Sequence, residues 1–271
     1  MAEPSMNRHL ILIHGAWQGS WSFAAWRPLL ARQGWHTHAV DLPGNGWNDC
    51  PPESASLETY VDHVCALIDT LDGPAVVLGH SGGGIVASQV AETRPARVAC
   101  LVYLAGMMLP SGLSFAQLVS QCREAHPEAD LRGIGAYLKY DDEQRFSSVP
   151  PEAARRIFLH DCPDRDADFA VGLFRPQAER GRAMTPSLSP ERYGRVPRIY
   201  VEALQDRSVA HLCQRRMQAL CPGATRITLD CGHVPQLAQP ERLTELLCSA
   251  LEHQLAAGPI PRITPNQEAC Q

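Results

Sequence analysis

The stretch from Ala75 to Val90, AVVLGHSGGGIVASQV, constrains the fold more than any other part of the chain. It begins with a short apolar run that suits a buried strand and ends in an apolar pattern with helical spacing. Between the two, residues 79–83 match the pattern G-x-S-x-G. Glycines at these positions let a strand turn sharply into a helix and hold the central serine exposed. The stretch therefore predicts a nucleophile, Ser81, at the C-terminal edge of a sheet; the alternative is a plain tight turn.

Strand-like and helix-like segments alternate on both sides of this serine. Such alternation predicts an α/β fold, in which a mostly parallel central sheet carries crossover helices on both faces. The expected strands are residues 9–15, 36–44, 74–81, 98–106, 197–204 and 224–230, and the expected helices are residues 20–34, 56–71, 82–95, 210–221 and 239–257.

The alternation stops between residues 107 and 195. Short helix-like pieces lie there among connectors that contain proline and glycine. A segment of this length is too long to be one loop. We therefore expect a small helical cap at 107–195, inserted after the strand that follows the serine-bearing helix. The hydrolase-like core then comprises 1–106 and 196–257, and 258–271 form a C-terminal tail.

Composition narrows the class of partner. The net charge is -5 and no dense basic run occurs, which argues against nucleic acid or an anionic membrane. No apolar run is long enough for a membrane span, and the N-terminus lacks the features of a secretion signal. The ten cysteines form no C-x-x-C pair, so we expect free thiols in a reducing cytoplasm. No His, Cys or Asp cluster has the spacing of metal ligands, and we expect no metal.

A serine nucleophile requires a base and an acid that orients the base. His233 lies between the last expected strand and the last expected helix, which suits a base in the chain order Ser, acid, His. Two acids are candidates, Asp206 and Asp230. We favour Asp206 because a carboxylate beside a neighbouring strand can approach the far ring nitrogen of His233. Asp230 is poorly placed, only three residues before the histidine.

The oxyanion of an acyl-transfer reaction requires backbone donors. One is expected from Gly82, directly after Ser81, and the other from Ala16 in the loop HGAWQGSW. A simple glycine turn is the alternative for this loop. Trp17, in the same loop, is expected to form an aromatic wall of the substrate pocket.

Apolar residues of the cap are expected to roof the pocket, although most of them must simply pack the cap onto the core. The residues chosen as substrate-binding, besides Trp17, are Met107, Phe115, Phe158 and Val234. A roof of this kind favours a compact apolar or aromatic substrate over a sugar or a phosphate.

The segments LIHGAWQGSWSF, LGHSGGG, FLHDC, IYVEALQD and GHVPQL resemble the plant methylesterase and hydroxynitrile lyase group of the α/β-hydrolase superfamily and its bacterial esterase relatives. The resemblance extends over roughly residues 9–255 and is weakest in the cap. It implies a triad of Ser81, Asp206 and His233, with Ala16 and Gly82 as oxyanion donors. It also implies an enzyme without cofactors, often a homodimer.

Two positions depart from the lyases of that group. Gly15 and Val234 stand where the lyases carry threonine and lysine, and that lysine steadies the departing cyanide. The sequence therefore predicts a serine hydrolase that cleaves a small apolar or aromatic carboxylic ester through an acyl-enzyme. Lyase-like or other cofactor-free chemistry on the same scaffold, and a small-molecule receptor with slow turnover, are the alternatives.

Overall fold

The computed structural model describes residues 8–256. The first seven residues and the expected tail at 258–271, which includes Cys270, lie outside the described residues. The centre of the fold is a six-stranded parallel sheet in the order β2-β1-β3-β4-β8-β9. Its strands are β1 His9–Ile13, β2 His36–Val40, β3 Ala75–His80, β4 Val98–Leu104, β8 Arg198–Ala203 and β9 Thr225–Leu229. The expected α/β architecture is confirmed.

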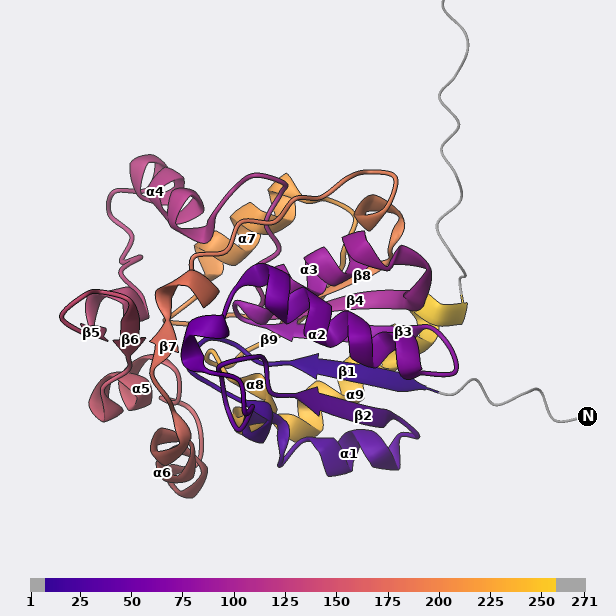
Figure 1. Cartoon of the computed structure of the whole chain (residues 1–271), viewed down its shortest axis with the longest axis horizontal. Helices are drawn as coiled ribbons and strands as arrows, with labels where there is room; N and C mark the ends of the chain where they lie inside the picture. Colours follow the sequence, from indigo (N-terminus) through magenta and orange to yellow (C-terminus); the bar gives the residue numbers. More distant parts are fainter. Residues whose placement is uncertain (1–7, 257–271) are drawn as a thin grey trace, which may run out of the picture.

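Helices cover both faces of this sheet (Figure 1). Two of them pack on one face and three on the other, and a single-turn helix precedes the last long one. The first face carries α1 Arg27–Arg32 and α9 Pro240–Ala256; the second carries α2 Leu57–Thr70, α3 Gly83–Thr93 and α7 His211–Leu220; the short helix is α8 Pro235–Ala238.

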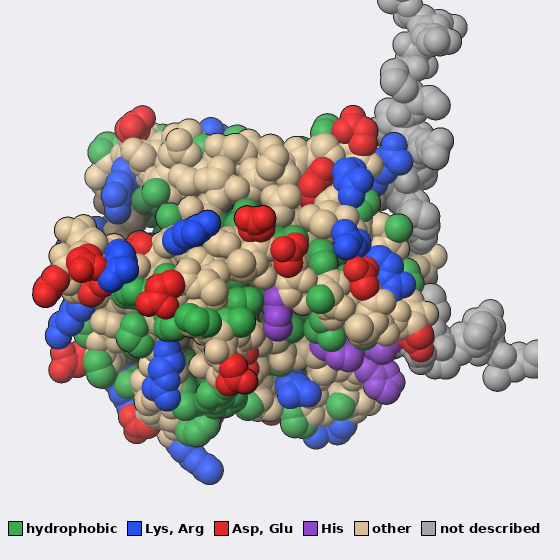
Figure 2. All heavy atoms as spheres, viewed as in Figure 1, with side chains coloured by type: hydrophobic (Ala, Val, Ile, Leu, Met, Phe, Trp, Pro, Cys, Tyr) green, Lys and Arg blue, Asp and Glu red, His purple; other side chains and the backbone are tan. Residues whose placement is uncertain are grey.

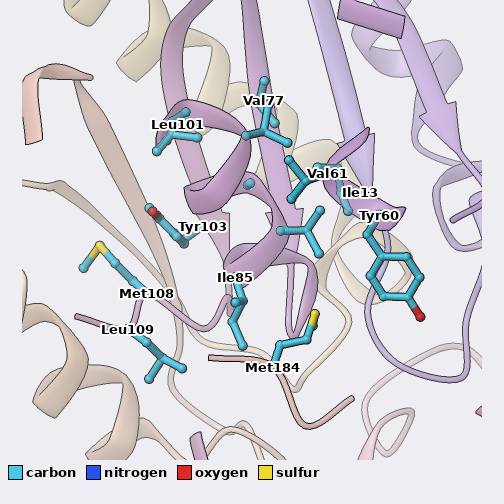
Figure 3. Packing of buried hydrophobic residues seen from close by; sticks show 14 of the residues in the cluster. Ile13, Tyr60, Val61, Val77, Ile85, Leu101, Tyr103, Met108, Leu109 and Met184 are labelled. Atoms are coloured by element: carbon cyan, nitrogen blue, oxygen red, sulfur yellow. The ribbon is translucent and has the colours of Figure 1, made fainter. Parts of the chain in front are cut away.

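The side chains of each central strand divide between these two faces. In β1, Leu10 and Leu12 enter one hydrophobic cluster, and Ile11 and Ile13 enter the other. Successive side chains of a strand point to opposite faces, so a strand covered on both sides must be apolar throughout. Figure 3 shows part of the cluster that contains Ile13, between the sheet and helices α2 and α3. The continuous apolar runs of the sequence follow from this double burial.

Most of the segment between β4 and β8 lies at one end of the sheet, toward which the arrows of β1 and β2 point (Figure 1), whereas residues 187–193 run back along α3 and bond to it. It contains helices and a three-stranded antiparallel sheet in the order β5-β6-β7. The small strands were not expected, because segments of two or three residues are too short to show a period. The elements are α4 Phe115–Ala125, α5 Pro151–Ile157, α6 Asp164–Leu173, β5 Lys139–Tyr140, β6 Phe146–Ser148 and β7 Gln177–Ala178.

The helix expected over residues 20–34 is shorter in the structure. Ser20–Phe23 form a 3-10 turn, and α1 begins only at Arg27. Pro28 explains the start, because proline fits the first turn of an α-helix but breaks its interior.

Charged groups of both signs share the surface in view (Figure 2), and the thiols of the described residues form no disulfide. Figure 2 shows Lys and Arg side chains interspersed with Asp and Glu on the face in view. None of the helices within residues 8–256 is both long and apolar enough to span a bilayer. Over the same residues the cysteines are free, and no group of His, Cys, Asp and Glu is arranged to hold a metal ion.

Candidate active site

Ser81 sits on a strained turn between β3 and α3. Its φ is 52°, a left-handed conformation that costs a residue with a side chain about 1–2 kcal/mol. Its N–H donates to the Leu104 carbonyl at 3.2 Å, and its carbonyl accepts the Met107 N–H at 2.8 Å. A Cβ on Gly79 would lie 2.4 Å from the Gly83 oxygen, so no larger residue fits there. The turn is therefore fixed by close backbone packing.

Asp206 and His233 form a buried pair. His233 Nδ1 lies 2.8 Å from Asp206 Oδ2. The other carboxylate oxygen, Oδ1, accepts the N–H groups of Ser208 at 2.7 Å and Val209 at 2.9 Å. Because the carboxylate only accepts hydrogen bonds, Nδ1 carries the proton and Nε2 presents its lone pair. The described residues offer no hydrogen-bond partner to Nε2, which is therefore free to take a proton in the pocket.

Asp230 lies elsewhere. Its side chain is exposed, and its Oδ1 accepts a hydrogen bond from Gln205 Nε2 at 2.8 Å. Of the two acids that the sequence offered, the structure brings Asp206 to His233.

His80 supports His233 from behind. The two rings lie 4.9 Å apart, and His80 Nε2 lies 2.8 Å from the His233 carbonyl oxygen. Burial lowers the pKa of His80 to about 3, with a further contribution from the charge of His233. His80 is therefore neutral near pH 7, and its one proton, on Nε2, is donated to the His233 carbonyl. On the other side Phe158 stacks on the His233 ring at 5.1 Å.

The two expected oxyanion donors flank the turn. Gly82 precedes the first turn of α3, where the helix dipole favours negative charge. Ala16 lines the same cavity as Ser81 and His233. Within the described residues, no hydrogen bond uses the backbone N–H of Ala16 or of Gly82. Both groups are thus available to a bound oxyanion.

A cavity of about 370 Å³ contains Ser81 and His233 in its lining. Four of the residues chosen as substrate-binding line it as well: Trp17, Met107, Phe115 and Phe158. Val234 is not among the lining residues. It is fully buried in a hydrophobic cluster with Trp17 and Phe158, because the chain turns into α8 directly after His233.

Polar residues that the sequence did not indicate also line the cavity. Arg182 pairs with Glu179 and lies 5.6 Å above the Trp17 ring. The guanidinium of Arg132 forms two hydrogen bonds with Asp130, at 2.9 and 2.8 Å. These pairs come from the segment where the sequence pattern is lost, so no periodicity pointed to them.

Two further residues of the cavity lining were not indicated by any sequence pattern. Arg123 donates to the Leu131 carbonyl at 3.0 Å. Cys213, on α7, is buried, and burial raises the pKa of its thiol to about 12. A thiol thus lines the cavity in addition to the serine hydroxyls, but it stays protonated near pH 7.

A family model described as the alpha/beta hydrolase family matches residues 10–246. The pyrethroid hydrolase of Sphingobium wenxiniae is 32% identical and aligns over 88% of this chain and 85% of its own length. Methylesterase 3 of Arabidopsis thaliana is 27% identical and aligns over 91% of this chain and 97% of its own length. The crystal structure of a pyrethroid hydrolase from Sphingobium faniae superposes with a TM-score of 0.78 at 29% identity, covering 90% of this chain and 97% of that one. Polyneuridine aldehyde esterase has a TM-score of 0.79 at 24% identity, covering 91% and 100%, and shows the shared fold.

Replacing the serine tests the nucleophile. Ser81→Ala is expected to lower kcat for p-nitrophenyl acetate by about 10⁶, because no other activated nucleophile faces His233. The matched control is Ser208→Ala, which changes another serine of the cavity lining and keeps the backbone N–H that Asp206 accepts. Steady-state kinetics on folded protein measure both. A Ser81→Ala enzyme that retains more than a few per cent of activity would contradict the assignment.

A pair of conservative changes tests the acid. Asp206→Asn is expected to lower kcat by about 10⁴, because an amide NH₂ facing Nδ1 forces the wrong tautomer on His233. Asp230→Asn makes the same chemical change at the exposed carboxylate and should leave kcat within a few-fold of the parent. If the two variants rank in the opposite order, Asp230 is the acid.

Proposed function

This chain belongs to the alpha/beta hydrolase family and is a serine ester hydrolase, and we propose that it cleaves small apolar or aromatic esters through an acyl-enzyme on Ser81. The observation that carries the mechanism is the buried pair of His233 and Asp206, with atoms 2.8 Å apart, at the cavity that Ser81 lines. Relatives named pyrethroid hydrolase and methylesterase support the reaction class.

In the proposed reaction His233 Nε2 takes the proton of Ser81 as the serine oxygen attacks the ester carbonyl. The N–H groups of Ala16 and Gly82 stabilise the tetrahedral oxyanion. His233 then gives the proton to the leaving alcohol, and water activated by the same ring releases the acid. Asp206 stays ionised and stabilises the imidazolium that forms in each step.

Aromatic and aliphatic side chains support an apolar substrate. Trp17 and Phe158 have ring centroids 6.2 Å apart, and Phe158 stacks against the base. Of the arginines in the lining, Arg182 and Arg132 already bind carboxylates of this chain. Their charge is therefore largely neutralised before a substrate arrives.

We further propose that residues 107–195 act as a cap, and that the enzyme works in the cytoplasm as a homodimer. The cavity lining combines residues of this segment with residues of the core, which supports a roof over the site. The free thiols among the described residues fit a reducing compartment. The family resemblance supports the dimer, and sedimentation equilibrium tests it: a protomer mass at working concentration would contradict it.

A series of p-nitrophenyl esters from acetate to palmitate tests the substrate class. Each buried methylene is worth about 0.8 kcal/mol, or roughly fourfold in kcat/KM, until the cavity is full. We expect kcat/KM to rise over short acyl chains and then to fall where the cap blocks longer ones. Small aryl esters should be cleaved and long-chain triglycerides should not. A maximum at palmitate would indicate an open groove and exclude the capped cavity.

A charged substrate provides the control for this series. p-Nitrophenyl butyrate and p-nitrophenyl hemisuccinate differ mainly in a methyl group against a carboxylate. The neutral ester is expected to have the higher kcat/KM, because an apolar lining disfavours a buried charge. Preference for the anionic ester would make Arg123 a carboxylate anchor and contradict the apolar assignment. Fast labelling of Ser81 by a fluorophosphonate without turnover of any ester would favour a receptor.

A further inference from the structure

Trp17, the residue after the expected oxyanion donor Ala16, is tied to the segment between β4 and β8 at three points. Its backbone N–H donates to Gln177 Oε1 at 2.6 Å, and its indole N–H donates to Ser147 Oγ at 3.0 Å. Its carbonyl accepts the N–H of Arg175 at 3.1 Å. Both sides of this backbone position are therefore set by residues of the cap.

The two peptide groups that flank Ala16 have different supports. His14 Nε2 accepts the Leu42 N–H at 3.2 Å, so the proton of the neutral ring is on Nδ1, which donates to the Gly15 carbonyl at 2.8 Å. Burial lowers the pKa of His14, which keeps the ring neutral. The core thus contacts the peptide that carries the Ala16 N–H at one point, its Gly15 carbonyl oxygen. The next peptide, from Ala16 to Trp17, is held by Gln177.

Gln177 is itself locked in a buried network. Its side-chain NH₂ donates to the Gly181 carbonyl and to Tyr60 Oη, each at 3.3 Å. Tyr60 Oη also accepts from Asn45 Nδ2 at 2.7 Å. The Gly181 carbonyl can only accept, so the amide must present its oxygen to Trp17. In Figure 3 the Tyr60 ring lies beside Ile13 and Val61, and its hydroxyl points away from the apolar side chains.

The hydrogen bond to Gln177 stabilises a backbone conformation of Trp17 that is otherwise unfavourable. Trp17 has a φ of 60°, in the left-handed region that residues with a Cβ disfavour. Rotating the peptide between Ala16 and Trp17 would return this φ to negative values. The buried acceptor on Gln177 opposes the rotation, because the N–H would lose its only partner among the described residues.

We propose that Gln177 is a positioning residue for the oxyanion hole: through the Trp17 N–H, it fixes the backbone on which the Ala16 donor is presented. The inference rests on the proposed ester hydrolysis. Gln177 does not line the cavity that holds Ser81 and His233, so it acts on the reaction through Trp17 and not through contact with the substrate.

Gln177→Met tests the proposal, because methionine has a similar length and no acceptor for the Trp17 N–H. For p-nitrophenyl acetate, kcat is expected to fall by about 10- to 100-fold, in the range seen for a displaced or lost oxyanion donor. KM should stay within about twofold. The inhibition constant of a trifluoromethyl ketone, which places an oxyanion in the same hole, should rise in parallel with the loss of kcat.

Ser147→Ala is the matched control. It removes a cap hydrogen bond to the same tryptophan, but at the indole and not at the backbone. This variant should keep kcat and the inhibition constant within about threefold of the parent. A folded Gln177→Met enzyme with an unchanged inhibition constant and kcat, or with its loss confined to KM, would overturn the proposal.

Two arrangements keep the test decisive. If Gln177→Met does not fold by circular dichroism, Tyr60→Phe removes one anchor of the Gln177 amide. A several-fold fall in kcat at constant KM then supports the proposal, and an unchanged kcat overturns it.

If the parent cleaves no ester, the proposed function fails. The rate of Ser81 labelling by a fluorophosphonate still reports the hole, because the phosphoryl oxygen uses the same N–H donors; Gln177→Met should slow it.

Discussion

The close approach of helix α3 to the sheet is the constraint on which the rest of the site depends. A Cβ on Gly83 would lie 2.6 Å from the Ile13 and His14 carbonyl oxygens, so the helix can begin this near to β1 only with glycine there. Beside this contact the backbone at Ser81 has a positive φ, and Ser81 lines the cavity. The contact also places Gly82 and the loop after β1 on the same side. This packing contact between backbones thereby helps to arrange Ser81, the proposed nucleophile, and the N–H groups proposed as oxyanion donors.

Around that contact, connected hydrogen bonds pair the buried polar groups and restrict the side chains to few conformations. The carboxylate of Asp206 accepts three hydrogen bonds at 2.9 Å or shorter, and the neutral ring of His80 holds the carbonyl of His233. Buried polar networks of this kind specify one arrangement because each broken bond leaves an unpaired group in a low dielectric. His233, the proposed base, is thus held both at its ring and at its backbone carbonyl.

Most of the core could be predicted from the sequence. Apolar runs indicate strands that are buried on both faces, and the order of the candidate residues along the chain limits which of them can meet. The alternating segments identified the six central strands, and chain order with reach favoured Asp206 over Asp230. The family and the ester hydrolase expected from the quoted segments are confirmed. Contacts between residues far apart in the sequence could not be predicted from local patterns. Trp17 and Gln177, for example, are separated by 160 positions. Strands β5, β6 and β7 are too short to show a period. The turn that buries Val234 cannot be recognised from the spacing of apolar residues.

The raised pKa of Cys213 has a consequence for reagents aimed at this cavity. At neutral pH its thiol is almost wholly protonated, and a thiol without its thiolate is a poor nucleophile. Haloacetamides and maleimides that enter the cavity would therefore react slowly with this thiol, although it lies in the lining. Electrophiles that react with an activated serine hydroxyl are therefore expected to label Ser81, the proposed nucleophile, in preference to Cys213.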